Sequence, residues 1–135
     1  MKTRRKFFKK LGGITALLTL GSVARANEST AQPQGNFFHV VFFWLINDSQ
    51  EVSEKFEHEV RQFIDHVEEI KTSHIGTPAD TDRDVIDNTW SYSLVLSFDS
   101  KKEHDIYQEH EAHLKFIENA SSLWEKVLVY DSIKT

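Results

Sequence analysis

The sequence contains no cysteine, two prolines and five glycines among its 135 residues. Without cysteine no disulfide framework is possible, so stability must come from packing and self-association. A lipoprotein anchor is excluded as well, because the lipid is attached to a cysteine. There is also no glycine-rich loop to carry a competing chemistry. The apolar run at residues 11–23 is shorter than the roughly 20 residues that a membrane-spanning helix requires.

Basic residues are concentrated at the N-terminus. Arg4 and Arg5 precede two phenylalanines, the apolar run follows, and Ala24-Arg25-Ala26 forms a small-x-small cleavage pattern. Residues 1–26 resemble a cleavable twin-arginine export signal, and an ordinary secretory signal is the alternative. The expected location is therefore periplasmic or secreted, with no stable membrane anchor after cleavage.

Cleavage after Ala26 would leave nine basic and 21 acidic residues, a net charge of −12. A surface of that sign repels phosphate backbones, which argues against a nucleic-acid partner. Residues 27–36 are polar, contain Pro33 and Gly35, and are expected to form a flexible linker.

Hydrophobic periodicity predicts six elements in one domain over residues 37–133. Phe37 to Ile46 is typical of a strand buried on both faces. Spacings of three and four from Val52 to Ile70 predict an amphipathic helix of about 20 residues. Strands are expected at 73–77, 90–98 and 127–130, and a second helix from about 101 to 119. The aspartate-rich loop before residue 90 lacks the glycine and glutamate of a calcium loop and is expected to be solvated.

The order β-α-β-β-α-β predicts an α+β fold of the ferredoxin-like type, with both helices on one face of an antiparallel sheet. The other face then needs a cover. Pairing two such sheets across a two-fold axis would close a dimeric α/β barrel, so a homodimer is expected.

The segment from His104 to Phe116 holds three of the seven histidines, and Tyr107, His110 and His113 recur at every third residue. Positions six apart lie about 120° apart around one helix, so Tyr107 and His113 converge only if the helix breaks between them. A break near His110 would bring the two rings together.

The chain resembles the stress-responsive α/β barrel (Dabb) family over residues 36–133. The resemblance rests on His39 in the first strand, the aromatic strand at 90–98, the Tyr107-x-x-His110-x-x-His113-x-x-Phe116 signature and the closing residues 124–131. It implies a ferredoxin-like subunit in a dimeric barrel.

One plant branch of that family comprises polyketide cyclases. By that resemblance, His113 takes the position of the catalytic base, Tyr107 that of its hydroxyl partner, and His39 that of a pocket histidine. Glu111 stands where the family commonly has proline, and Tyr92 stands where the cyclase branch has histidine.

The expected function is binding of a small, largely apolar molecule in a pocket between helices and sheet. For an enzyme, the resemblance assigns the catalytic roles to Tyr107, His113 and His39. A neutral imidazole would remove a proton next to a carbonyl, and the phenol would donate to the enolate. The residues expected to line the pocket are His110, Tyr92, Phe43 and Leu94. A cyclase- or lyase-like enzyme and a non-catalytic structural dimer, in which the histidines cap helix ends, are the alternatives.

No metal site and no cofactor are assigned from the sequence. Glu109 and His113, or His110 and His113, have spacings that would serve a metal, and haem ligation by the histidines is a further alternative. His58, His66 and His104 lie among charged residues and are expected to be solvated.

Overall fold

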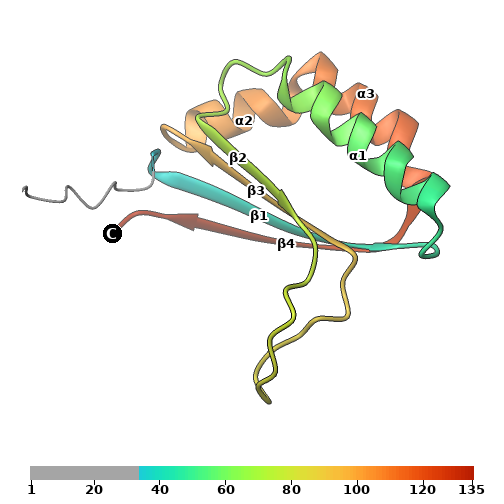
Figure 1. Cartoon of the computed structure of the whole chain (residues 1–135). Helices are drawn as coiled ribbons and strands as arrows, with labels where there is room; N and C mark the ends of the chain where they lie inside the picture. The colour runs from blue at the N-terminus through green and yellow to red at the C-terminus, as the bar shows by residue number, and fades with distance from the viewer. Residues whose placement is uncertain (1–33) are drawn as a thin grey trace, which may run out of the picture. The chain divides into compact units, whose positions relative to one another are not determined.

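The computed structural model describes residues 34–135, so the expected export signal and most of the expected linker lie outside the described residues. The described part forms four strands, three α-helices and one 3-10 helix (Figure 1). In chain order they are β1 (Phe37–Leu45), α1 (Gln50–Ile64), β2 (Thr72–Gly76), β3 (Tyr92–Phe98), α2 (Lys101–Glu109), α3 (Glu111–Ala120), η1 (Ser121–Leu123) and β4 (Trp124–Ile133).

The four strands form one antiparallel sheet in the order β2-β3-β1-β4. All three α-helices lie on the same face of this sheet (Figure 1). The predicted α+β, ferredoxin-like arrangement is confirmed, with the second helix divided into α2 and α3.

The central strand β1 alternates strictly between buried and partly buried residues. Its buried side faces the helices and carries Phe37, Val41, Phe43 and Leu45, each of which contributes about 1.5–3 kcal/mol through burial. His39 is the one polar side chain in this row. The strand therefore places an imidazole inside an otherwise apolar layer.

Helix α1 begins after Ser49, whose Oγ accepts a hydrogen bond from the Val52 N–H at 3.3 Å. It has 15 residues and ends at Ile64, so the prediction of a longer helix was wrong. The apolar spacing continues to Ile70 because Val67 still packs into the core from the turns after the helix. The apolar spacing after Ile64 therefore reflects burial of these side chains and not a continuation of the helix.

The second helical segment, predicted as one helix, is divided at His110, the position where a break would bring Tyr107 and His113 together. The His110 backbone is extended (φ −65°, ψ 135°), and its Nδ1 accepts a hydrogen bond from the Ala112 N–H at 3.1 Å. Glu111 then occupies the first turn of α3, where its negative charge interacts favourably with the helix dipole and stabilises the helix. A side-chain cap thus stands at the break between α2 and α3.

Element ends differ from the sequence prediction where pairing extends or shortens a strand. β4 runs over ten residues instead of four because it pairs with β1 along nearly its whole length. β3 begins at Tyr92 rather than at residue 90. In the loop between β2 and β3, the four aspartates are exposed.

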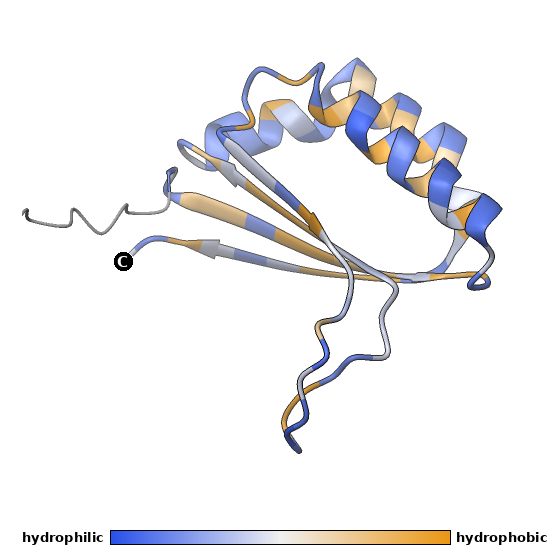
Figure 2. Cartoon of the chain, viewed as in Figure 1, coloured by the Kyte–Doolittle hydropathy of each residue, from blue (hydrophilic) through white to orange (hydrophobic). Residues whose placement is uncertain are grey.

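Figure 2 shows apolar residues along β1 and part of β4. By the alternation and pairing of these strands, every second one of them lies on the sheet face opposite the helices. Phe42 on this face contacts the rings of Trp90 and Tyr130. Leu128 and Tyr130 of β4 are exposed there. Among the helices of residues 34–135, none has the length and apolar character needed to cross a bilayer.

Candidate functional site

Buried His39 on β1 is paired with the partly exposed Asp131 on β4. The two residues lie opposite each other in the antiparallel register, and His39 Nδ1 is 2.6 Å from Asp131 Oδ1. A carboxylate only accepts, so Nδ1–H donates and Nε2 keeps its lone pair. The Asp131 side chain is 42% exposed, so this end of the pair is accessible at the edge of the sheet.

Burial lowers the pKa of His39 below its ordinary value, and the hydrogen bond to Asp131 opposes this only in part. His39 is therefore neutral at neutral pH. The sequence offered no role for Asp131, although it lies within the closing motif. The pairing of the first strand with the last is what makes it a partner of His39.

Tyr107 lies at the centre of the aromatic contacts and is 2% exposed. Its ring centroid is 4.4 Å from that of His113 and 5.6 Å from that of His39. Burial raises the pKa of the phenol well above its usual value, with the charge of Asp131 adding to the effect. Within residues 34–135 the hydroxyl has no hydrogen-bond partner, so it is a protonated donor that a ligand can use.

His113 is oriented by the backbone of the preceding helix. Its Nδ1 donates to the Gln108 carbonyl oxygen at 3.2 Å, which leaves Nε2 unprotonated. Burial lowers the pKa of His113, so the ring is a neutral base at neutral pH. The break at His110 turns α3 and brings His113 onto Tyr107, which meets the condition that the sequence set for their convergence.

His104 was predicted to be solvated, and this prediction was wrong. The residue is 8% exposed, and its ring stacks on Phe37 at 4.4 Å between centroids and lies 5.0 Å from His39. The flanking charges suggested an outer face, whereas the three-residue spacing to Tyr107 places His104 on the same inner face. We call His39, His104, Tyr107 and His113 the ring cluster.

Other residues predicted to bind a ligand lie elsewhere. Tyr92 donates its hydroxyl to Glu57 Oε1 at 2.7 Å, and its ring packs against Phe56. Phe43 packs in the core between Phe56 and Trp124, and Leu94 is buried opposite Val41. His110 serves as the cap of α3. The structure thus brings Tyr107, His113 and His39 together, but not these four.

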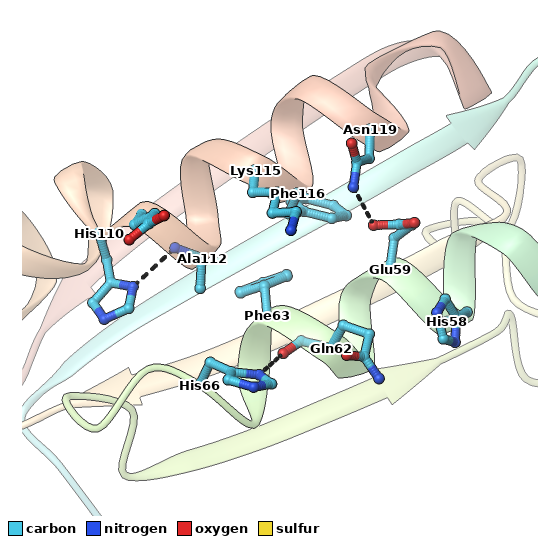
Figure 3. A pocket seen from close by; sticks show the side chains of 11 residues that line it. His58, Glu59, Gln62, Phe63, His66, His110, Ala112, Lys115, Phe116 and Asn119 are labelled. Atoms are coloured by element: carbon cyan, nitrogen blue, oxygen red, sulfur yellow. Dashed lines mark hydrogen bonds between the residues drawn. The ribbon is translucent and has the colours of Figure 1, made fainter.

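A cavity of about 490 Å³ lies between α1 and α3 (Figure 3). Phe63 and Phe116 line it, together with polar groups that are already hydrogen-bonded within the protein. His66 Nδ1 donates to the Gln62 carbonyl at 2.6 Å, and Asn119 donates to Glu59 at 3.1 Å. Because only His110 of the predicted site residues lines this groove, we place the candidate site at the ring cluster.

In the two histidines whose spacing would serve a metal, the backbone engages one nitrogen of each ring. Nδ1 of His110 accepts from Ala112, and Nδ1 of His113 donates to Gln108. In the described part of the chain, the three groups that converge in a metal-compatible way are instead His39, His104 and Asp131.

Comparison with known proteins places this geometry among ferredoxin-like proteins. The model of a family described as the stress responsive A/B barrel domain (Dabb) matches residues 37–134. A Dabb family protein of Mesorhizobium loti with a ferredoxin-like fold is 17% identical, with 76% of this chain and 99% of that chain covered and a TM-score of 0.63. No curated protein matches the chain.

Two further solved structures are similar. A dimeric protein of unknown function from Bacteroides fragilis is 20% identical, with 74% and 97% of the two chains covered and a TM-score of 0.58. A hydroxynitrile lyase from Passiflora edulis is 20% identical, with 76% and 96% covered and a TM-score of 0.62. At these identities the likeness establishes the fold.

Proposed function

Because the chain belongs to the stress responsive A/B barrel (Dabb) family, we propose that it is an exported homodimer that binds a small, largely apolar molecule beside the ring cluster. The observation that carries this proposal is the convergence of His39, Tyr107 and His113, with Asp131 of the edge strand β4 bonded to His39. Burial keeps all three uncharged, which suits recognition of a neutral polar group such as a carbonyl.

The apolar part of such a molecule has a surface next to the cluster. In the register of β4, Val127 and Val129 share the helix-facing side with Asp131 and are each 44% exposed. A ligand whose apolar body lies on the two valines can direct its polar end toward the Tyr107 hydroxyl. This location replaces the deeper lining by Phe43, Tyr92 and Leu94, whose side chains pack in the core.

Benzaldehyde is a suitable probe, because it joins an apolar ring to one carbonyl. We expect its addition to shift the methyl NMR signals of Val127 and Val129 and to leave residues of the groove between α1 and α3, such as Ala112, unchanged. Tyr107→Phe should weaken binding by removing the donor. Shifts confined to the groove would refute this site.

The homodimer is supported by the apolar sheet face opposite the helices and by the dimeric state of the Bacteroides fragilis protein. Exposed Leu128 and Tyr130 would be covered by a second copy of the same face. Export is supported by the twin-arginine pattern of residues 1–26. Mass spectrometry of the protein recovered from the periplasm tests this. A mass equal to that of a chain starting at Asn27 would establish both the export and the cleavage site.

Lyase chemistry is the second candidate, favoured by the contact between Tyr107 and His113 and by the similarity to a hydroxynitrile lyase. In cleavage of a cyanohydrin, Nε2 of His113 would take the hydroxyl proton while the carbon–carbon bond breaks to give a carbonyl and cyanide. The proton then passes from His113 to cyanide.

Release of benzaldehyde from mandelonitrile tests this chemistry. His113→Ala should lower the rate by about 10²–10⁴-fold, the usual contribution of a general base. His58→Gln, a substitution at an exposed histidine of α1, should leave it unchanged. A rate equal to that of the uncatalysed reaction would exclude this substrate and leave the binding proposal to its own test.

A further inference from the structure

We propose that His39, His104 and Asp131 form a binding site for one divalent cation of the Zn²⁺ type. Each residue offers a ligand atom, and these atoms all lie within 4.8 Å of one another. The proposal goes beyond the small-molecule site, and it does not require that any organic ligand binds.

The three ligands come from three elements that the fold holds together. His39 on β1 and Asp131 on β4 are opposite each other in the sheet, and His104 reaches them from the first half of α2. His104 is fixed by stacking on Phe37 at 4.4 Å. Ligands on a sheet and a packed helix are better preorganised than ligands on loops.

A second observation concerns the nitrogens of His104. Its Nδ1 is buried and has no hydrogen-bond partner within residues 34–135, and the nearest carboxylate oxygen, on Asp105, is 3.6 Å away. Buried polar atoms are normally satisfied, and an exception in a cluster of imidazoles and a carboxylate points to an ion. The other two ligands, by contrast, bond to each other in the absence of a metal.

The donor set decides the class of cation. Two imidazoles and one carboxylate suit Zn²⁺ and related first-row ions, whereas Mg²⁺ and Ca²⁺ prefer oxygen ligands alone. Three protein ligands leave a fourth position for water or a small molecule, as in catalytic rather than structural zinc sites. Asp131, with its exposed side chain, places that position at the accessible edge of the sheet.

Modest side-chain movement completes the site. A tetrahedral Zn²⁺ with bonds of about 2.0–2.1 Å holds its ligand atoms about 3.3 Å apart. The ligand atoms, now within 4.8 Å, must draw together while the 2.6 Å bond between His39 and Asp131 widens. With Nδ1 of His104 on the ion, its Nε2–H is the donor. The Gln108 side-chain amide lies 3.1 Å from Nε2, and rotating this amide by 180° presents its oxygen as the outer acceptor.

Zinc titration of the full-length chain, followed by calorimetry and metal analysis, tests the proposal. We expect one Zn²⁺ per chain, and X-ray absorption at the zinc edge should show two imidazoles and oxygen ligands. Asp131→Asn keeps the size of an exposed side chain, and His104→Phe keeps the stack on Phe37, so both variants should fold. Each should weaken zinc binding by about 100-fold or more, because loss of even an outer-shell partner costs 10–100-fold.

The groove between α1 and α3 provides the control, since it contains His58, His66 and His110. His58→Gln should bind zinc as the unchanged chain does. Circular dichroism of each variant verifies that it is folded. The proposal is overturned if His104→Phe and Asp131→Asn retain full affinity, or if His58→Gln loses it. Because no organic ligand enters this experiment, its failure would leave the small-molecule proposal standing.

Discussion

Burial determines the protonation state of the ring cluster. His113 contacts Tyr107, Phe63 and Phe116, and its Nδ1 bonds to the Gln108 carbonyl. The neighbouring imidazoles of His39, His104 and His110 add to the burial that lowers its pKa. Protonation of His113 is therefore less favourable in the folded protein than in the unfolded chain. The free energy of unfolding depends on pH for this reason.

The sign follows from comparing the folded and unfolded states. Unfolded His113 takes up a proton near the ordinary pKa of about 6.5, whereas folded His113 does so only at lower pH. The unfolded chain therefore binds more protons as the pH falls below 6.5, and stability is lost in that window. Because the ring is partly solvent-screened, we expect a loss of less than about 1 kcal/mol from this residue between pH 7.5 and 5.5.

Urea unfolding at fixed protein concentration, with a chelator present, measures this loss. His113→Phe should show a weaker dependence on pH over the same window, because its ring has no proton to bind. His58→Gln should behave like the unchanged chain. Equal pH dependence in all three proteins would show that His113 does not carry the effect.

The ring and the hydroxyl of Tyr107 have separable contributions. The hydroxyl has no partner in the described domain, so Tyr107→Phe should change the free energy of unfolding by less than about 1 kcal/mol. Tyr107→Ala removes a buried ring and should cost about 3–5 kcal/mol. Urea unfolding distinguishes the two, and a large loss in Tyr107→Phe would mean that the hydroxyl is bonded after all.

Single residues were predictable from the sequence where a short-range pattern placed them. The spacing of Tyr107 and His113 predicted their convergence once a break was assumed. Asp131 was missed because its partner His39 lies 92 positions away, and only the strand register brings them together. His104 was misjudged because its charged neighbours in sequence point away from the core.

At the scale of elements, the break between α2 and α3 is what assembles the site. His110 is extended at φ −65° and ψ 135°, the conformation favoured before proline, and Glu111 begins α3. The first position of a helix tolerates proline because its N–H needs no partner within the helix. The local backbone is therefore compatible with proline at position 111.

We accordingly expect Glu111→Pro to change the free energy of unfolding by less than about 1 kcal/mol. Lys115→Pro, in the middle of α3, should cost about 3 kcal/mol or more. Thermal unfolding monitored by circular dichroism compares the two. Severe destabilisation by Glu111→Pro would show that α3 does not begin where the structure places it.

The cap itself can be tested separately. His110→Ala removes the acceptor for the Ala112 N–H, and the loss should be about 1 kcal/mol. His110→Asp supplies another acceptor at the same position and should recover most of that stability. If His110→Ala is as stable as the unchanged chain, the cap is not what ends α2.

At the scale of the whole molecule, the proposed dimer depends on the sheet face opposite the helices. Val40 and Phe42 lie near the middle of this face, and apolar residues of β4 lie beside them. Val40→Glu should convert a dimer into a monomer, because a buried unpaired carboxylate in the interface is costly. Light scattering after gel filtration measures this, with Lys115→Glu on the helical side as control. A monomer at all concentrations in the unchanged chain would refute the dimer.

The fold was predictable because it depends on patterns that do not require distant partners. The alternation in β3, the continuous apolar run of β1, and the three- and four-residue spacing of α1 specify these elements and their order. Element ends were less predictable because they depend on tertiary contacts. β4 is longer than its apolar core suggests since β1 offers it a partner beyond Val127 and Tyr130.

The position of β4 at the edge of the sheet also bears on aggregation. Its run Val127-Leu128-Val129-Tyr130 is apolar and β-prone, and one side of its backbone lacks a strand partner in the described domain. Such a segment is a template for non-native pairing between partly unfolded chains. Lys126 and Asp131, at its two ends, are the kind of flanking charges that oppose such pairing. From its position we expect the charge of Asp131 to oppose aggregation whether or not His39 is bonded to it.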